Sequence, residues 1–337
     1  MTIDKYTPLF YSLSLGAKRQ FLYPVWEKRG GVNINTLFER SEKLSFKDTN
    51  GQISVSASSK IRKAVDWLVL ASKQKTVFVN ELKRQISFKL NFITLTLPCM
   101  QGVFTDVEIK NKALNLFLTT CRQKYNLINY IWKAEAQENG NIHFHITTDI
   151  YIHWGDLRKL WNRCLNTFGY LGLYKENMQN VHKNGFNFRS DLANHWSREK
   201  QYQAYLYGCK TDWSNPNTTD VHAVRKINNL SAYLTKYFCK NDTERRPITG
   251  RLWGMSAHLS KIIKARVEFT SDVTSELMHG FLNNKLVKFP CDYGISYLAT
   301  ASEIITHVGG KLGGFFRRII DYIQNPPPTL SANDLVF

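Results

Sequence analysis

Two strand-like segments joined by a tight turn restrict the possible folds of this chain more than any other part of its sequence. Residues 127–137 and 141–151 are rich in the β-branched and aromatic side chains that are typical of strands. Asn139-Gly140 lies between them, and this dipeptide favours the turn of a β-hairpin. The pattern predicts an antiparallel hairpin in the middle of the chain.

The segments on either side of this hairpin predict an α+β fold. A strand runs from Ile86 to Pro98, and a helix follows from a capping box formed by Thr105 and Glu108. A second helix follows the hairpin and ends before Gly169. The resulting order, β-α-β-β-α, is the first part of a ferredoxin-like antiparallel sheet with helices on one face.

The same patterns divide the chain into three segments. Residues 1–84 are expected to form an N-terminal mixed or helical extension, with a helix capped by Ser58 or Ser59. Residues 85–265 hold the predicted sheet and end with helices near residues 228–240 and 256–265. Residues 266–337 are expected to be a helical segment with a proline-rich tail.

The charge of the chain indicates a polyanionic partner. It has 45 Lys and Arg against 27 Asp and Glu, a formal net charge of +18. Such an excess favours nucleic acid or an anionic membrane surface, although a basic surface with no such partner stays open. No leader and no run of 18 apolar residues is visible, so we expect a cytoplasmic protein without a membrane partner. The six cysteines form no C-x-x-C pair and are expected to be reduced.

A histidine triplet lies in the second strand of the hairpin. His143 and His145 point to one face of that strand, whereas Phe144 points to the other. Two imidazoles on one face can share a metal ion. From the triplet alone, histidines that merely pack in the core or face solvent remain an equally open interpretation.

The length of the hairpin loop decides which carboxylate joins the histidines. A two-residue turn at Asn139-Gly140 places Glu138 on the histidine face. A three-residue loop, with Gly140 in the left-handed position, places Glu135 directly across from His143, and we favour this register. Two imidazoles and one carboxylate suit Mg²⁺ or Mn²⁺.

Two tyrosines and a lysine share a helix near residues 231–240. Tyr233, Lys236 and Tyr237 lie at the i, i+3 and i+4 positions of one face, while Leu234 and Phe238 can anchor the other. A metal ion that polarises a phosphodiester and a nearby cation make attack by a phenolate feasible. The alternative is that both tyrosines are ordinary residues at the edge of the core.

Three motifs in sequence order resemble those of the HUH endonucleases: Phe92–Pro98, His143–His145 and Tyr233–Tyr237. Within that superfamily, the two tyrosines flanking a lysine resemble the rolling-circle replication initiators of single-stranded DNA phages, with plasmid initiators as relatives. The stretches Trp132–Glu135 and Asp220–His222 also resemble the microvirus-type initiators.

This resemblance implies a chemistry and a role for each site residue. His143 and His145 would bind the divalent metal, Glu135 would complete the site, and Tyr233 and Tyr237 would be the nucleophiles. Lys236 is expected to stabilise charge on the phenolate or the phosphate. The enzyme would nick single-stranded origin DNA, keep a 5′-phosphotyrosine link, leave a 3′-OH for a polymerase, and later rejoin the strands.

Several partners and alternatives follow from the same comparison. The chain lacks a G-x-x-x-x-G-K-[ST] loop, so a host helicase is expected to separate the strands and a host polymerase to extend the 3′-OH. A relaxase or a single-strand transposase would use the same chemistry on different DNA. A non-catalytic module that binds single-stranded nucleic acid through Phe92 and Phe144 is also possible. The sequence argues against a histidine-triad hydrolase, because the third histidine position is Thr147, and against a two-histidine phosphoesterase, because no second H-x-[ST] element is evident.

Overall fold

The protein is represented here by a computed structural model. The structure describes residues 10–14, 19–25, 52–79, 83–194, 196–224, 230–241, 244–263, 266–269, 287–291 and 294–298, together with positions 314, 317, 318, 320 and 321.

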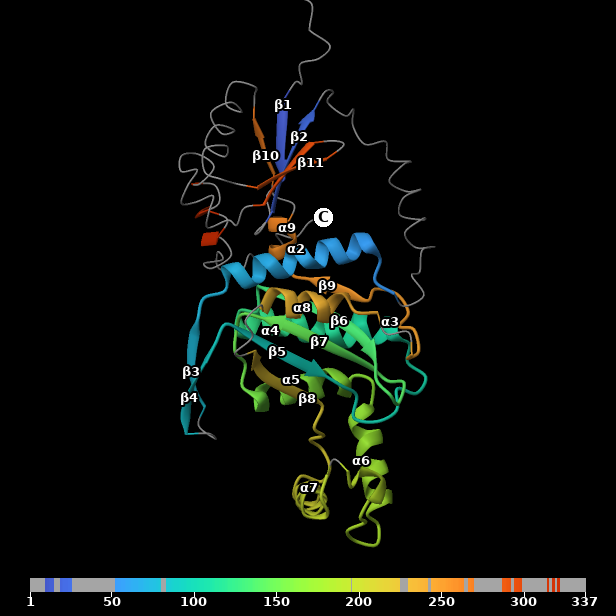
Figure 1. Cartoon of the computed structure of the whole chain (residues 1–337). Helices are drawn as coiled ribbons and strands as arrows, with labels where there is room; N and C mark the ends of the chain where they lie inside the picture. Colours follow the sequence, from blue (N-terminus) through green and yellow to red (C-terminus); the bar gives the residue numbers. More distant parts are fainter. Residues whose placement is uncertain are drawn as a thin grey trace, which may run out of the picture.

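A five-stranded antiparallel sheet forms the centre of the fold, in the order β8-β5-β7-β6-β9 (Figure 1). Its strands are β5 (Leu90–Leu95), β6 (Tyr130–Ala136), β7 (Ile142–Thr148), β8 (Thr219–Val224) and β9 (Trp253–Met255). Strands β5 and β7 are adjacent although a helix and β6 separate them in sequence, as the predicted β-α-β-β order requires. The predicted α+β class is confirmed.

The hairpin has the three-residue loop that places Glu135 opposite His143. The Gln137 N–H donates to the Asn141 carbonyl at 2.8 Å, and the Gly140 N–H donates to the Gln137 carbonyl at 2.9 Å. Gly140 has a φ of +81°, in the region where a glycine carries no steric cost. The loop length therefore brings the carboxylate and both histidines to one face of the sheet.

Helices cover both faces of the sheet, which corrects the expectation of helices on one face. The predicted pair, α4 (Asn115–Tyr125) and α5 (Trp154–Asn166), packs on one face, where the Trp161 ring lies 6.0 Å from that of Phe144. Helices α2 (Val55–Ala71) and α8 (Leu230–Cys239) lie over the other side (Figure 1). Helix α8 therefore carries its tyrosines on the same face of the sheet as the histidines.

Helix α2 begins earlier than predicted and belongs to the main core. Ser54, not Ser58 or Ser59, caps it, because the Ser54 hydroxyl accepts the Ala57 N–H at 3.2 Å. Its apolar side chains Ile61, Val65 and Leu68 are buried, and they pack in one hydrophobic cluster with the central sheet. Part of the expected N-terminal extension therefore shares its core with the sheet, and the boundary at residue 84 stays a prediction.

The predicted capping box is present at the start of α3 (Asp106–Glu108), which continues through a wider π-helical turn (Ile109–Leu114) into α4. Next to this capping box, the buried Asp106 carboxylate is hydrogen-bonded to the loop that precedes β9. It accepts bonds from both terminal nitrogens of Arg246, at 2.9 and 2.8 Å, and from the Thr249 N–H at 3.0 Å. Because Arg246 Nε also donates to the Gly140 carbonyl, this cluster fixes the hairpin turn.

The terminal segments contain a second antiparallel sheet, in the order β10-β1-β2-β12-β11. Its strands are β1 (Phe10–Ser14), β2 (Arg19–Val25), β10 (Arg266–Phe269), β11 (Val287–Cys291) and β12 (Gly294–Leu298). The expectation of a helical C-terminal segment therefore misses β10, β11 and β12, because β10 and β12 pair with the N-terminal strands β1 and β2, and β11 pairs with β12. Positions 314, 317, 318, 320 and 321 are helical, and the proline-rich tail lies outside the described residues.

The strand predicted from Ile86 to Pro98 is divided between β4 (Arg84–Phe88) and β5. Several other elements had no clear sequence signal: β3 (Lys75–Val79), which pairs with β4, the helices α6 (Tyr170–Val181) and α7 (Arg198–Lys210), and a short 3₁₀ turn (Ser190–Leu192). The last helix before β10 is α9 (Ala257–Ile263), close to its predicted place. Helices α6 and α7 lie on the far side of the sheet from α2 and α8 (Figure 1).

Candidate metal centre and tyrosine helix

Glu135, His143 and His145 form one compact cluster on the hairpin. The two imidazole Nε2 atoms are 2.6 Å apart. The Glu135 Oε2 atom lies 3.6 Å from His143 Nε2 and 3.4 Å from His145 Nε2. All three ligand atoms lie within 4.8 Å of one another, so a single cation can contact all of them.

The surroundings of the histidines leave these nitrogens available to a metal. The other ring nitrogen of His145, Nδ1, is hydrogen-bonded to the Thr94 hydroxyl at 3.1 Å, which fixes the orientation of the ring. Such a partner on the second nitrogen is typical of metal-binding histidines. The residues therefore fit a divalent metal bound by two imidazoles and one carboxylate.

Glu138, the alternative carboxylate, lies away from this cluster. Its side chain is 94% exposed, and its nearest charged partner is the Arg245 guanidinium at 3.9 Å. The three-residue loop therefore places Glu135 with the histidines and directs Glu138 to solvent.

Lys133 is a buried member of the site that sequence reasoning did not assign to it. Its side chain is only 5% exposed, and its Nζ lies 2.6 Å from Glu135 Oε1. The same ammonium donates to the Lys240 carbonyl at 2.6 Å and to the Tyr237 carbonyl at 3.2 Å. Lys133 thus joins the metal-binding carboxylate to the C-terminal end of α8, where carbonyl groups attract a cation. Its position two residues before Glu135, on the same strand face, is the signal that could have revealed it.

The electrostatics of the cluster favour an ionised Glu135 carboxylate beside a neutral His145 imidazole. Burial would raise the pKa of Glu135, but its contacts with His143 and His145 and the charge of Lys133 outweigh burial and hold that pKa far below its usual value. Burial also lowers the pKa of His145, against the opposing effect of Glu135. A metal-binding imidazole has to be neutral and a metal-binding carboxylate ionised, so these shifts favour binding near neutral pH.

Helix α8 directs one tyrosine onto this cluster. Leu234 and Phe238 are fully buried and hold the helix against the core, as predicted. The Tyr237 hydroxyl donates to Glu135 Oε2 at 3.4 Å, and its ring makes an edge contact with His145 at 5.2 Å. Burial, followed by the negative charge of Glu135, raises the pKa of the Tyr237 phenol well above its usual value. The phenol is therefore protonated in this arrangement.

Tyr233 and Lys236 lie farther toward solvent than Tyr237. Tyr233 is one helical turn before Tyr237 on the same side of α8, and its side chain is 47% exposed. Lys236 is also exposed, and no contact of the described residues joins it to the carboxylate or the histidines. The structure thus brings together four of the six predicted site residues: Glu135, His143, His145 and Tyr237.

Phe92 connects these groups to the edge of the sheet. Its ring centre lies 5.2 Å from His145, 5.1 Å from Tyr237 and 5.3 Å from His222 on the edge strand β8. Phe92 was predicted as a strand residue, but its position among these rings depends on strand pairings that sequence alone does not show. One aromatic surface therefore extends from the metal cluster to the edge of the sheet.

Comparison with known proteins supports the class of protein that this arrangement indicates. A family model described as a replication-associated protein matches residues 90–242, which include all six predicted site residues. This match fits a rolling-circle replication protein, as the resemblance predicted, and the HUH superfamily is consistent with it. No curated protein and no solved structure gives a match. Within the described part of the chain, none of the helices has the length and apolar character needed to cross a membrane.

Proposed function

We propose that this protein initiates rolling-circle replication by nicking single-stranded origin DNA through attack of a tyrosine on a metal-bound phosphate. The observation that carries the proposal is the contact of the Tyr237 hydroxyl with a metal-binding carboxylate, 3.4 Å from Glu135 Oε2. The family match supports a replication protein, and this contact supports the nuclease chemistry.

The metal site would consist of His143, His145 and Glu135, with Mg²⁺ or Mn²⁺ as the native cation. When bound, the cation would polarise the scissile phosphodiester and offset the negative charge of Glu135, which adds to burial in raising the pKa of the Tyr237 phenol. Thr94 would hold the His145 ring in place, and Lys133 would hold Glu135. The site would thus be organised before DNA binds.

In the nicking step, the phenolic oxygen of Tyr237 would form a bond to phosphorus while the bond from phosphorus to the 3′ oxygen breaks. The phenol proton would pass through solvent to the departing 3′ oxygen, which leaves as the 3′-OH, and the DNA would remain attached through a 5′-phosphotyrosine. The hydrogen bond to Glu135 would orient the phenol, because a carboxylate whose pKa lies far below its usual value is a weak proton acceptor. The free 3′-OH would then serve as the primer for a polymerase.

Tyr233 would supply the second nucleophile of a strand-rejoining cycle. One tyrosine would hold the 5′ end while the other attacks the regenerated origin, because the two lie one turn apart on the same helix. Lys236 would stabilise charge on the phosphate in either step, although it points to solvent here. A shift of α8 or the bound DNA itself would have to bring these two side chains to the phosphate.

We propose a single-stranded origin as the substrate, with a host helicase and a host polymerase as partners in the cytoplasm of a bacterial host. The net charge of +18 supports a polyanionic substrate. A relaxase or a single-strand transposase would use the same residues, so the DNA that is cut distinguishes these activities.

The direct test of the function is to map the covalent adduct on DNA. The protein is incubated with Mn²⁺ and 5′- or 3′-labelled single-stranded origin DNA, and the denatured products are separated and digested. We expect the label 3′ of the nick to stay with a peptide that contains Tyr237 or Tyr233, and a free 3′-OH on the other fragment. Binding without any adduct or cleavage would instead favour a non-catalytic binding module.

A further inference from the structure

The segment from Tyr170 to Thr218, here called the arm, connects α5 to the edge strand β8 and contains α6 and α7. Seven of the fifteen exposed large hydrophobic side chains among the described residues lie in this arm. They are Leu173, Val181, Leu192, Trp196, Tyr202, Leu206 and Tyr207. Because isolated apolar side chains on a surface need no explanation but a gathered set does, the arm is a candidate binding surface.

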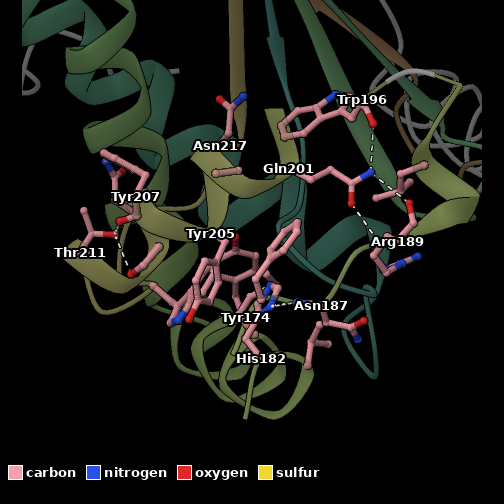
Figure 2. A pocket seen from close by; sticks show the side chains of 18 of the residues that line it. Tyr174, His182, Asn187, Arg189, Trp196, Gln201, Tyr205, Tyr207, Thr211 and Asn217 are labelled. Carbon is pink, nitrogen blue, oxygen red and sulfur yellow. Dashed lines mark hydrogen bonds between the residues drawn. The ribbon is translucent and has the colours of Figure 1, made fainter. Parts of the chain in front are cut away.

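Aromatic side chains line a cavity of about 330 Å³ between α6 and α7. The His182 ring lies nearly parallel to those of Trp213, at 5.1 Å and 6°, and Phe186, at 6.4 Å and 10°. Figure 2 shows the rings of Tyr174, His182 and Tyr205 gathered in the cavity, with Trp196 beside Gln201. The volume is within the range of small-molecule pockets.

Hydrogen bonds hold this cavity in shape. The Gln201 amide accepts the Arg189 N–H at 2.9 Å and donates to the Arg189 and Trp196 carbonyls, both at 3.0 Å (Figure 2). Trp213 lies directly against α7 at Gly208, where a Cβ atom would collide with the indole ring. The pocket is therefore preformed, which lowers the entropy cost of binding a flat ligand.

A second cavity connects the arm to the edge of the sheet. It has a volume of about 650 Å³, includes His222, and shares Arg158 and Asn217 with the arm pocket. Since the His222 ring lies 5.3 Å from Phe92, and Phe92 lies 5.2 Å from His145, this path reaches the metal cluster. At the junction, the Arg158 guanidinium lies 4.9 Å from the Trp154 ring centre and donates to Asn217 at 2.6 Å.

The chemistry of the path favours single-stranded nucleic acid over a protein segment. This path combines aromatic rings with the cation of Arg158 at its junction, and the arm adds the exposed lysines Lys183, Lys200 and Lys210. Unpaired bases stack on aromatic side chains, and their phosphates pair with such cations. Among the described residues that line the two cavities, Asp220 is the one acidic residue, and its carboxylate lies 3.4 Å from His222 Nδ1. Elsewhere on the arm, Asp191 and Asp212 are paired with Arg189 and Lys175, and Glu176 and Glu199 are exposed.

We infer that the arm pocket binds unpaired bases of the same DNA strand that the metal centre cuts, with β8 and Arg158 guiding the strand between the two sites. This inference rests on the proposed function. It assigns DNA recognition to the arm and cleavage to the metal cluster. A strand bound in the arm would then reach the tyrosines at a fixed number of nucleotides from the bound bases.

The test compares a double variant, Trp196→Ala with Tyr207→Ala, with a matched variant, Phe78→Ala. All three side chains are exposed, at 46%, 46% and 57%, so the substitutions leave the core intact. The probes are oligodeoxythymidylate of about 30 nucleotides and an abasic oligomer of equal length, which exceed the usual site sizes of about 4–16 nucleotides. Affinity is measured by fluorescence anisotropy at fixed salt, and a thermal melt checks folding.

We expect the double variant to bind oligodeoxythymidylate at least about tenfold more weakly, with little change for the abasic oligomer and none for Phe78→Ala. If the natural protein binds tightly and the double variant binds equally tightly, the arm inference is wrong, whereas the proposed nicking function is unaffected. No binding by the natural protein would overturn the proposed function as well. If sedimentation instead shows that the natural protein is a dimer and the double variant a monomer, the arm is an interface between copies and the inference is wrong.

Discussion

The metal centre and the arm use aromatic side chains in opposite ways. In the centre, Phe92 and Tyr237 pack against charged and imidazole groups whose positions are fixed by β-strand register. In the arm, rings line an open cavity and several, including Trp196, are exposed. We propose from this contrast that the buried region would perform the chemistry and that the exposed region would contribute affinity for DNA.

The largest expected effect on this proposed division comes from removing one of the two histidines proposed to bind the metal. We expect His143→Ala or His145→Ala to abolish nicking in Mn²⁺ and to leave affinity for single-stranded DNA within a few-fold, because binding depends on the basic surface and the arm. Product gels and anisotropy on the same protein samples measure both quantities. Normal nicking by either variant would remove the metal assignment.

The two carboxylates near the turn test the hairpin register. Glu135→Gln is expected to lower metal affinity and nicking by about 10-fold to 100-fold, because a ligand loses its charge. Glu138→Gln is the matched control, since its side chain is 94% exposed, and should change neither. Isothermal titration with Mn²⁺ and initial nicking rates give the ranking, and the opposite ranking would contradict the site proposed here.

Substitution of Lys133 tests whether the metal cluster depends on the buried lysine that contacts Glu135. We expect Lys133→Met to reduce nicking by about tenfold through weaker metal binding, because Glu135 and the end of α8 lose their shared partner. Raising the Mn²⁺ concentration should restore part of the rate, and Lys133→Arg should restore part of it at low Mn²⁺. A loss that neither change relieves would show that Lys133 acts only on folding.

The smallest effect concerns stability at low pH. Burial opposes ionisation of Asp106, but hydrogen bonds from Arg246, Gln101 and Thr249 outweigh burial and lower its pKa from 3.8 to about 2. A lowered carboxylate pKa stabilises the fold above the unfolded value, and this contribution of about 2 kcal/mol is lost as the pH falls from about 4 to about 2.

Asp106→Asn should therefore lower the free energy of unfolding by about 2 kcal/mol at pH 7, with the difference from the natural protein shrinking toward pH 2. Urea titrations at several pH values measure this dependence. The exposed Asp191, which pairs with Arg189 on the surface, provides the control Asp191→Asn, and we expect little change from it. An equal loss from both variants would contradict the role of the buried cluster.

Much of the metal centre could be predicted from sequence because its determinants are local. The i, i+2 spacing places His143 and His145 on one strand face, and the favoured three-residue loop ending at Gly140 places Glu135 across the hairpin, although Asn139-Gly140 also allows a two-residue turn that selects Glu138. The i, i+2 spacing from Glu135 could have placed Lys133 on the same strand face, but its contact with the end of α8 could be recognised only from the folded arrangement.

Helix α7 of the arm could not be predicted because its apolar side chains do not coincide with its buried positions. The buried positions of α7 are Gln201 and Gly208, whereas Tyr202, Leu206 and Tyr207 are exposed. Helical periodicity identifies a helix that buries its apolar side chains, so it fails for a helix that exposes them. The terminal sheet was missed for a different reason, since it pairs strands from opposite ends of the chain.

The central claim is that a tyrosine of α8 attacks the DNA. It is tested most directly by measuring how much covalent adduct Tyr233→Phe, Tyr237→Phe and the double variant form on labelled single-stranded origin DNA with Mn²⁺. Because only Tyr237 contacts the metal-binding carboxylate, at 3.4 Å, we expect Tyr237→Phe to lose more adduct than Tyr233→Phe. The double variant should form none, while its DNA affinity stays near that of the natural protein. A covalent adduct in the double variant would place the nucleophile elsewhere and contradict the account.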